Sequence, residues 1–398
     1  MRIAFLTSEY VTESLFYGGL ANYLYNVAVS LKKRGHDVEI FTASDKNKTI
    51  VHHEIVVHQI KSNSFWQRKL KAFFKHRLKI LLNSTFDNIF LSYKINKQFQ
   101  KTHQQKPFDI VQASSYKSVG FFIIRNKQTP IVTRVTSFET KIRVIYGWNL
   151  NLDNALSEWM EFFQMRNSNG LYAPSKLLAQ LIPTYDPIRI DVINPPFFPV
   201  SLANLDESIY NQNLLNVSYL LFYGWISELK GVNFIWENLP EIFEQNEEIH
   251  FAFVGSGATP EINDSLKKYS HRIHVFEPLQ HAQLFTVILN AKALVLPSKF
   301  DNLPNTCREA MYLKKVVVGT YGASFDEMID HEKNGFLIHY GNNSELCQTI
   351  NRICLMSQNE LDEIGQNAHE TILQKFNPEK QVIELENYFL KIIEAEKK

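Results

Sequence analysis

The sequence predicts an α/β protein of two domains, each built around a parallel β-sheet. Short apolar runs of strand length alternate with segments whose apolar residues recur at helical spacing. Residues 2–42 and 291–319 are each predicted to form a strand–loop–helix–strand unit, the βαβ element of parallel sheets. With 398 residues, of which 45% are hydrophobic, the chain is long enough for two cores.

The first βαβ unit carries two glycines where its loop meets its helix. Residues 2–8 are predicted as a buried strand, apolar residues from 20 to 31 follow helical spacing, Gly35 caps the helix, and residues 37–42 form the next strand. Gly18 and Gly19 lie at the junction of loop and helix. Glycines there let backbone N–H groups approach a ligand oxygen closely, although a tight turn explains them equally well.

Two carboxylates mark the second unit. An apolar strand at 291–296 ends at Pro297, and a loop and a short helix lead to another strand at 316–319. Ligands of parallel sheets bind beyond the carboxyl ends of the strands, where the loop at 298–304 lies. Asp301 belongs to this loop and Glu309 to the helix. Taken singly, each is more often an ordinary exposed carboxylate.

Further apolar runs complete the two predicted sheets. Ser175 is expected to cap a helix, and Ser324 and Phe325 are expected to precede a helix that carries Glu327 and whose first N–H groups could hold an anion. Residues 358–398 are predicted to be helical, with a kink at 376–378. The other predicted strands lie at 108–114, 130–137, 170–174, 219–223, 249–257, 273–279 and 335–337.

Composition narrows the function classes. A net charge of +1 gives no global sign of nucleic-acid binding. The three cysteines form no Cys-x-x-Cys pair, and no zinc-like histidine spacing lies beside them, which favours a reducing cytosol and no metal. The first ten residues do not suit a signal peptide, and no run of about 18 apolar residues is present.

Residues 61–106 are unusually basic. They hold eleven lysines and arginines against one acid, Asp87, with aromatic and leucine residues interleaved at roughly helical spacing. A basic amphipathic helix of this kind is typical of a membrane surface. A helix that packs on its own domain and exposes a basic face is an equally simple explanation.

Together these motifs resemble glycosyltransferase family 4, whose members are retaining enzymes with the GT-B fold. The segment PSKFDNLPN, followed by EAM, is similar to the family's signature of two acids separated by seven residues. Gly224, Lys230 and Gly231 match a second motif, and Gly18-Gly19 a third. The resemblance implies two Rossmann-like domains, 1–200 and 201–375, that face a cleft, and a C-terminal helix, 376–398, that returns to the first domain.

The resemblance also implies roles for individual residues. Lys230 is expected to bind the diphosphate of a nucleotide-sugar, Asp301 to lie near the sugar, and Glu309 to bind the ribose hydroxyls. Departures from the family pattern are Trp225 in place of an arginine and no histidine at the strand ends near Arg134, Ser137 and Glu139. Arg308 could supply the missing charge. The expected donor-binding set is Gly18, Gly19, Gly224, Lys230, Gly255, Asn302, Leu303 and Glu309.

The predicted function is therefore transfer of a sugar from a nucleotide-sugar to a hydroxyl, with retention, in the synthesis of a cell-surface glycan or glycolipid. No cofactor is expected beside the nucleotide-sugar, because the chain has no Asp-x-Asp metal motif. The expected location is cytoplasmic, with peripheral contact to the inner membrane face through 61–106. Alternatives are an epimerase or phosphorylase of the same fold, or a non-catalytic partner subunit.

Overall fold

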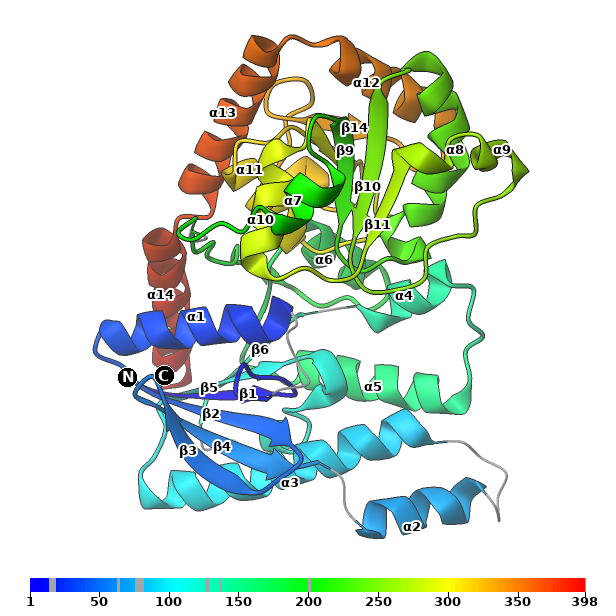
Figure 1. Ribbon diagram of the computed structural model, residues 1–398. Coiled ribbons are helices and arrows are strands. Elements are labelled where there is room, and N and C mark those ends of the chain that lie inside the picture. Colours follow the sequence, from blue (N-terminus) through cyan, green and yellow to red (C-terminus); the bar gives the residue numbers. More distant parts are fainter. Residues whose placement is uncertain are drawn as a thin grey trace. The chain divides into compact units, whose positions relative to one another are not determined.

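The computed structural model describes residues 1–13, 19–62, 65–75, 82–125, 129–136, 138–199 and 202–397 (Figure 1). The chain forms two compact units. Unit 1 contains Met1–Pro196 and Pro378–Lys398, and unit 2 contains Phe197–Asn377. Both are α/β units with helices packed against a central sheet (Figure 1).

Unit 1 is organised around a sheet in which eight strands are described, in the order β3-β4-β2-β1-β5-β6-β7-β8. Every described pair is parallel except β3 with β4. The central strands are buried along their whole length, as expected for apolar strands covered on both faces. The strands are β1 (Arg2–Thr7), β2 (Asp37–Ser44), β3 (Lys48–His52), β4 (Ile55–Lys61), β5 (Ile110–Ser114), β6 (Ile131–Arg134), β7 (Gly170–Ala173) and β8 (Asp191–Val192).

The antiparallel edge hairpin β3–β4 was not predicted from the sequence. Its turn is formed by His53 and Glu54, which adopt φ values of +48° and +62°. Two consecutive positive φ values are typical of the tight hairpin turn that usually contains asparagine and glycine. Because neither residue is present here, the turn could not be recognised from the residue types.

Helices cover both faces of the sheet in unit 1. The helices α1 (Gly19–Lys33) and α14 (Pro378–Glu396) pack on one face, where Leu24, Val27 and Phe389 join the strand residues Ile3 and Phe5. On the other face α3 (Asn83–Gln105) contributes a buried row to a second cluster. The remaining helices are α2 (Phe65–Phe73), α4 (Glu139–Ile145), α5 (Leu152–Arg166) and α6 (Lys176–Leu181), and Ser175 caps α6 as predicted.

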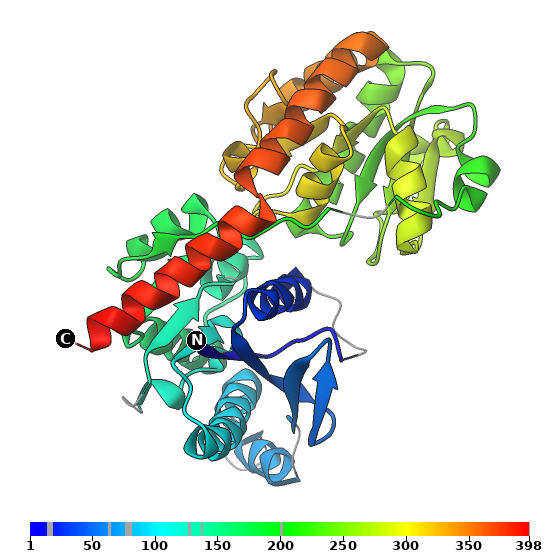
Figure 2. The same ribbon diagram turned by 90° about the vertical axis from the view of Figure 1, so that its left-hand side faces the viewer.

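The final helix α14 is part of unit 1 although it follows unit 2 in the chain (Figure 2). Its Tyr388 packs edge-on against Tyr172 of β7, with ring centroids 5.7 Å apart. Glu386 accepts a hydrogen bond of 2.7 Å from Nε of Arg34, at the end of α1. The chain therefore leaves unit 1 near Pro196 and re-enters it at Pro378.

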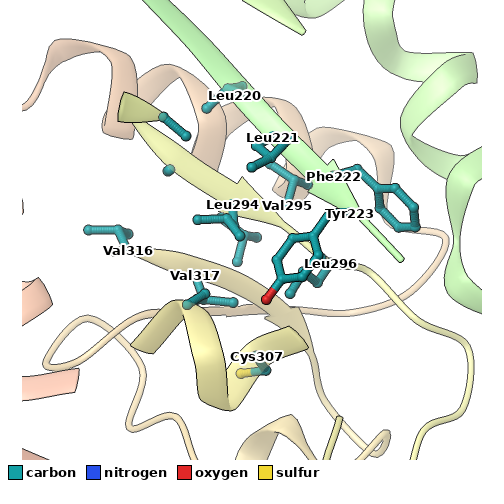
Figure 3. Close-up of a cluster of buried hydrophobic side chains, with 14 of the residues drawn as sticks. Leu220, Leu221, Phe222, Tyr223, Leu294, Val295, Leu296, Cys307, Val316 and Val317 are labelled. Carbon is teal, nitrogen blue, oxygen red and sulfur yellow. The ribbon is translucent and has the colours of Figure 1, made fainter. Parts of the chain in front are cut away.

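Unit 2 has a sheet whose six described strands follow the order β11-β10-β9-β12-β13-β14, and all described pairs are parallel. Leucine, valine and phenylalanine from neighbouring strands fill its core (Figure 3). This composition suits a sheet buried on both faces. The strands are β9 (Ser218–Tyr223), β10 (Ile249–Val254), β11 (Ile273–Phe276), β12 (Ala293–Val295), β13 (Val317–Thr320) and β14 (Phe336–Ile338).

One predicted helix of unit 2 is reduced to a single turn. Residues Phe325–Glu327 form only a single 3-10 turn, and Ser324 before it has φ +60°. The N–H groups of Met328 and Ile329 both donate to the carbonyl of Phe325, which closes a single turn, and the chain then continues to β14. The helices of unit 2 are α7 (Ser208–Asn213), α8 (Val232–Gln245), α9 (Asp264–Lys267), α10 (His281–Asn290), α11 (Asn305–Tyr312), α12 (Asn343–Leu355) and α13 (Gln358–Lys375).

In the described part of the chain, no helix combines the length and the apolar character needed to cross a bilayer.

Candidate functional site

The two central strands of unit 2 bring Lys230 and Asp301 together. Strand β9 pairs with β12, so the loops that follow them meet at the carboxyl edge of the sheet. Lys230 ends a 3-10 turn after β9, and Asp301 lies in the loop after β12. The ammonium of Lys230 forms an ion pair with Oδ2 of Asp301. The side chains are 29% and 14% exposed, so the pair is reachable from solvent.

The loop that carries Asp301 is held by hydrogen bonds. Oδ1 of Asp301 accepts from the N–H of Asn302 at 2.9 Å, and Ser298 Oγ donates to Oδ2 at 3.4 Å. Ser324 is buried, accepts from the N–H of Leu303 at 2.7 Å, and donates to the carbonyl of Asp301 at 3.3 Å. Leu303 has φ +50°, an uncommon conformation for a residue other than glycine. Ser324 thus fixes the loop, and the N–H of Leu303 is already donated to it.

Glu309 lies on α11 beneath the end of β9. The hydroxyl of Tyr223, the last residue of β9, reaches towards α11 (Figure 3). It donates to the carbonyl of Thr306 at 2.7 Å and to Oε2 of Glu309 at 3.1 Å, so these two acceptors share its single proton. Burial raises the pKa of Glu309, and the hydrogen bond from Tyr223 opposes that rise. The carboxylate is therefore fixed in orientation while its second oxygen can accept from a ligand.

Two glycines at the same edge allow backbones to approach closely. A Cβ on Gly255 would lie 1.7 Å from the carbonyl oxygen of Gly224, and one on Gly231 would lie 1.9 Å from that of Pro297. The loops after β9, β10 and β12 can therefore pack together only with glycine at these positions. Gly224, Lys230, Gly255, Asn302 and Glu309 all lie in loops or helices that follow strands of the unit 2 sheet.

The other predicted donor-binding residues lie elsewhere. Gly18 is outside the described residues, as is Ser137. Gly19 is the exposed first residue of α1 in unit 1.

Trp225, at the position of the family's arginine, is 63% exposed. Arg308 lies over the rings of Phe197 and Phe376 and donates to Asn305, so its guanidinium is engaged with residues outside the predicted donor set.

Sequence reasoning missed two residues of this edge and misassigned a third. Tyr223 could have been noticed as the polar end of the apolar run YLLFY. Ser324 was noticed, but as the start of a helix. Lys299, which pairs with Glu228 and lies 5.3 Å from the ring centroid of Tyr340, gave no signal because its partners are distant in the sequence.

Unit 1 contains a cavity of about 560 Å³ at the carboxyl edge of its own sheet. Ser8 follows β1, Ser44 ends β2, Tyr116 follows β5, and Glu139 begins α4 after β6, and all four line the cavity. The cavity therefore occupies the usual ligand position of a parallel α/β sheet. Its size suits a small organic ligand.

Carboxylates outnumber bases in the lining of this cavity. The acids are Glu13, Asp45, Asp87, Glu139, Glu158 and Glu161, and the bases are Lys46, Lys117 and Arg143. Arg143 Nε donates to Glu158 at 2.8 Å. Burial, followed by the charges of Glu139 and Glu158, raises the pKa of Glu161 well above its ordinary value. A raised pKa favours the protonated form of Glu161, whereas the ionised carboxylates of the wall accept hydrogen bonds, which suits hydroxyl groups.

Two family models match the chain one after the other. Residues 17–197 match the model described as Glycosyltransferase Family 4, and residues 218–355 match the model described as Glycosyl transferases group 1. An uncharacterized glycosyltransferase of Methanocaldococcus jannaschii is 21% identical over 402 residues, which cover 95% of each chain.

Solved structures of similar fold align with nearly the whole chain. A sucrose-phosphate synthase from Thermosynechococcus elongatus has a TM-score of 0.76 at 16% identity, with 99% of both chains covered. The Anabaena protein HepE, solved in complex with UDP-glucose, has a TM-score of 0.69 at 15% identity, with 99% of this chain and 100% of that chain covered. These likenesses and the two parallel sheets confirm the predicted GT-B fold.

Proposed function

Since the chain belongs to glycosyltransferase family 4, we propose that it transfers a sugar from a nucleotide-sugar to a hydroxyl with retention at the anomeric carbon. The observation that carries this proposal is the joint position of Lys230, Asp301 and Glu309 at the carboxyl edge of unit 2. A nucleotide-sugar requires a cation for its phosphates, an acceptor for its sugar hydroxyls and an oriented carboxylate for its ribose. Lys230, Asp301 and Glu309 supply these groups in that order. The UDP-glucose complex of HepE supports the same class of donor.

The chemistry we propose relies on electrostatic stabilisation of the leaving group. The bond from the anomeric carbon to the phosphate oxygen breaks, and a bond to the acceptor oxygen forms on the same face. The departing phosphate oxygen takes the acceptor's proton, so no protein nucleophile is assigned. Lys230 stabilises the charge that develops on the phosphate, and Asp301 holds the lysine in place before the reaction starts. No cofactor or metal takes part in this scheme.

We propose the cavity of unit 1 as the acceptor site. Its carboxylates favour a ligand rich in hydroxyl groups, and its position at a strand edge supports a specific ligand site. A sugar at the end of a cell-surface glycan or glycolipid has this chemistry. Its hydroxyls would donate to side chains such as Glu139 and Glu158.

A membrane-bound acceptor is supported by the exposed face of α2. Arg68 and Lys69 are exposed there, as is Lys75 just after the helix, and the apolar side chains of Leu70 (37%) and Phe73 (52%) are exposed as well. The second half of the basic segment differs, because Leu91, Ile95 and Phe99 of α3 are buried in the core. We therefore restrict the proposed contact with anionic lipid at the inner membrane face to α2 and the residues that follow it, up to 75.

Product analysis tests the proposed reaction. The purified chain is incubated with a panel of nucleotide-sugars, with and without glycan acceptors, and the products are separated by chromatography. Acceptor-dependent release of a nucleoside diphosphate supports the transferase, whereas a changed sugar without acceptor identifies an epimerase. Proton NMR of the fresh product then gives the anomeric configuration. An inverted product would refute retention, and no turnover with no binding of any nucleoside diphosphate would favour a non-catalytic subunit.

Co-sedimentation tests the membrane contact. The chain is mixed with phosphatidylglycerol-containing vesicles at low salt, and each base near such a surface contributes about 1 kcal/mol. Replacing Arg68, Lys69, Lys71 and Lys75 by serine should release the protein. A matched variant replaces four exposed lysines on other helices and loops, Lys267, Lys268, Lys333 and Lys391, and should still bind. Equal loss in both variants, or no binding by the wild type, would refute a specific role of α2.

A further inference from the structure

Two buried carboxylates line the cavity of unit 1 without an ion pair. Glu13 lies in the loop after β1 and Glu161 on α5, and they are 7% and 8% exposed. Within the described part of the chain neither has a cationic partner, whereas Glu158 in the same wall pairs with Arg143 at 2.8 Å. A charge that is taken out of water is costly unless a counter-charge accompanies it. The cavity therefore has room for a positive charge that the described side chains do not supply to these two acids.

Neutral donors hold Glu13 in a fixed direction. Ser44 Oγ donates to Oε2 of Glu13 at 2.8 Å, and the side-chain amide of Gln59 donates to Oε1 at 2.5 Å. Thr12 Oγ1 adds a longer hydrogen bond of 3.2 Å to Oε1. These donors orient the carboxylate and bring no charge, and Oε2 keeps a lone pair for a further donor. Glu13 is thus an oriented acceptor whose negative charge is not balanced.

Glu161 has negative neighbours. Burial, followed by the charges of Glu139 and Glu158, raises its pKa, and a hydrogen bond from the backbone of Lys117 opposes that rise. The ammonium of Lys117 is directed elsewhere, since it lies 5.2 Å from the ring centroid of Tyr116. In the whole lining, six acids face three bases. A positive group of a ligand would therefore be attracted to this wall.

The cavity also contains a buried hydroxyl without a partner. Ser8 is 1% exposed and lines the cavity, and its Oγ has no hydrogen-bond partner among the described residues. Because a buried polar group usually has a partner, this hydroxyl indicates a ligand that completes the hydrogen bond. No group of three histidines, cysteines or acids in the described residues could hold a metal ion. The cation that fits this wall is therefore an organic one with polar groups beside it.

We propose that the cavity of unit 1 binds an acceptor sugar that carries an ammonium group, with Glu13 and Glu161 as its counter-charges. The inference rests on the proposed function, because it narrows the acceptor from any ligand rich in hydroxyls to an amino sugar. An ammonium has three N–H donors and no acceptor, which suits a wall whose polar groups are mostly carboxylates. The hydroxyl of Ser8 serves a neighbouring hydroxyl of the same sugar.

Ligand-observed NMR titration of the full chain provides the test. Each probe is a methyl glycoside in three matched forms, with a free amine, an N-acetyl group or a hydroxyl at the same carbon, in the gluco, galacto and manno series. At least one amine should bind about tenfold more tightly than its two counterparts, as expected for one added charge pair. Glu13→Gln and Glu161→Gln should each remove this preference and leave the Kd of the hydroxyl form nearly unchanged. Glu394→Gln removes an exposed carboxylate of α14 and should change nothing.

The outcomes separate the inference from the proposed function. Equal affinity for the three forms in every series overturns the inference, as does a preference that persists in both variants. Equal weakening of all three forms in the variants would show a structural role, and displacement of the amine by calcium chloride, but not by sodium chloride of equal ionic strength, would assign the charge to a metal. None of these results affects sugar transfer, which is measured separately by acceptor-dependent release of a nucleoside diphosphate.

Two further results are also decisive. If no probe binds, both the inference and the choice of this cavity as the acceptor site are wrong. If circular dichroism shows that Glu13→Gln does not fold, Glu161→Gln gives the same comparison.

Discussion

The hydroxyl of Tyr223 at the end of β9 donates a hydrogen bond of 3.1 Å to Oε2 of Glu309 on α11. The phenol thus orients a carboxylate whose burial raises its pKa. The hydrogen bond favours the charged form, so it helps to keep Glu309 an acceptor near neutral pH. This geometry supports a binding role for Glu309, in which two ribose hydroxyls donate to it.

Glu309→Gln should therefore raise the donor KM about tenfold and leave kcat nearly unchanged, because the amide offers a single acceptor oxygen. A raised KM with an unchanged kcat shows that the variant has lost an interaction that stabilises the bound donor and the transition state equally. Tyr223→Phe keeps the carboxylate and removes its orientation, so it should raise KM less. Steady-state kinetics with varied donor measure both. An unchanged KM with a lowered kcat would instead put Glu309 at the reacting carbon.

Lys230→Ala should lower kcat by about 10²–10³-fold, the usual cost of losing one group that stabilises developing charge. Asp301→Asn keeps the shape of the ion-pair partner of Lys230 but removes its charge, so the lysine should be held less rigidly. Because the lysine itself remains, kcat should fall less than in Lys230→Ala. Circular dichroism checks that both variants are folded. If Lys230→Ala keeps activity within about threefold of wild type, its assignment to the leaving phosphate is wrong.

Much of the fold could be predicted because the strands are short, apolar and separated by helices with caps. Ser175 before α6 and the break at Phe376–Pro378 are local signals, and both are found in the structure. The β3–β4 hairpin was missed because His53 and Glu54 adopt positive φ values, which are not expected for these residue types.

The site was predictable only in part, because its contacts join residues far apart in the sequence. The motifs singled out Lys230, Asp301 and Glu309, but not the pairing of Lys230 with Asp301 across 71 positions. Nor could they assign Ser324 to the loop that carries Asp301, since that role depends on a hydrogen bond to the N–H of Leu303. The cavity of unit 1 collects side chains from several strand ends and has no sequence signature at all.

Gly231→Ala should destabilise the chain and lower activity together. Gly231 has φ +78°, and a Cβ there would collide with the carbonyl oxygen of Pro297 at 1.9 Å. Overpacking of this kind costs about 1–3 kcal/mol, in addition to the strain of a positive φ. Gly341→Ala is the matched control, because Gly341 has φ +84° but no atom within 4 Å of its Cβ position. Urea unfolding should show a loss of about 1 kcal/mol in the control and clearly more in Gly231→Ala. Equal losses would mean that the loop after β12 can move aside.

The pair His250 and His274 should make stability fall on acidification. Their ring nitrogens Nδ1 and Nε2 are 2.9 Å apart on the neighbouring strands β10 and β11. Burial, followed by the charge of His274, lowers the pKa of His250 to about 4, and burial also lowers the pKa of His274. Arg272 and His271, the other charged neighbours, act in the same direction on His250.

Because the folded pKa of His250 lies below the value of about 6.5 in an unfolded chain, the fold favours the neutral ring. Its contribution is complete above about pH 6.5 and is lost as the pH falls towards 4. His250→Gln keeps a hydrogen-bonding partner for His274 and cannot be charged. The melting temperature of the wild type should therefore drop more steeply than that of the variant between about pH 7 and 5. All other titrating groups are common to both proteins, so parallel curves would show that the pair does not govern acid stability.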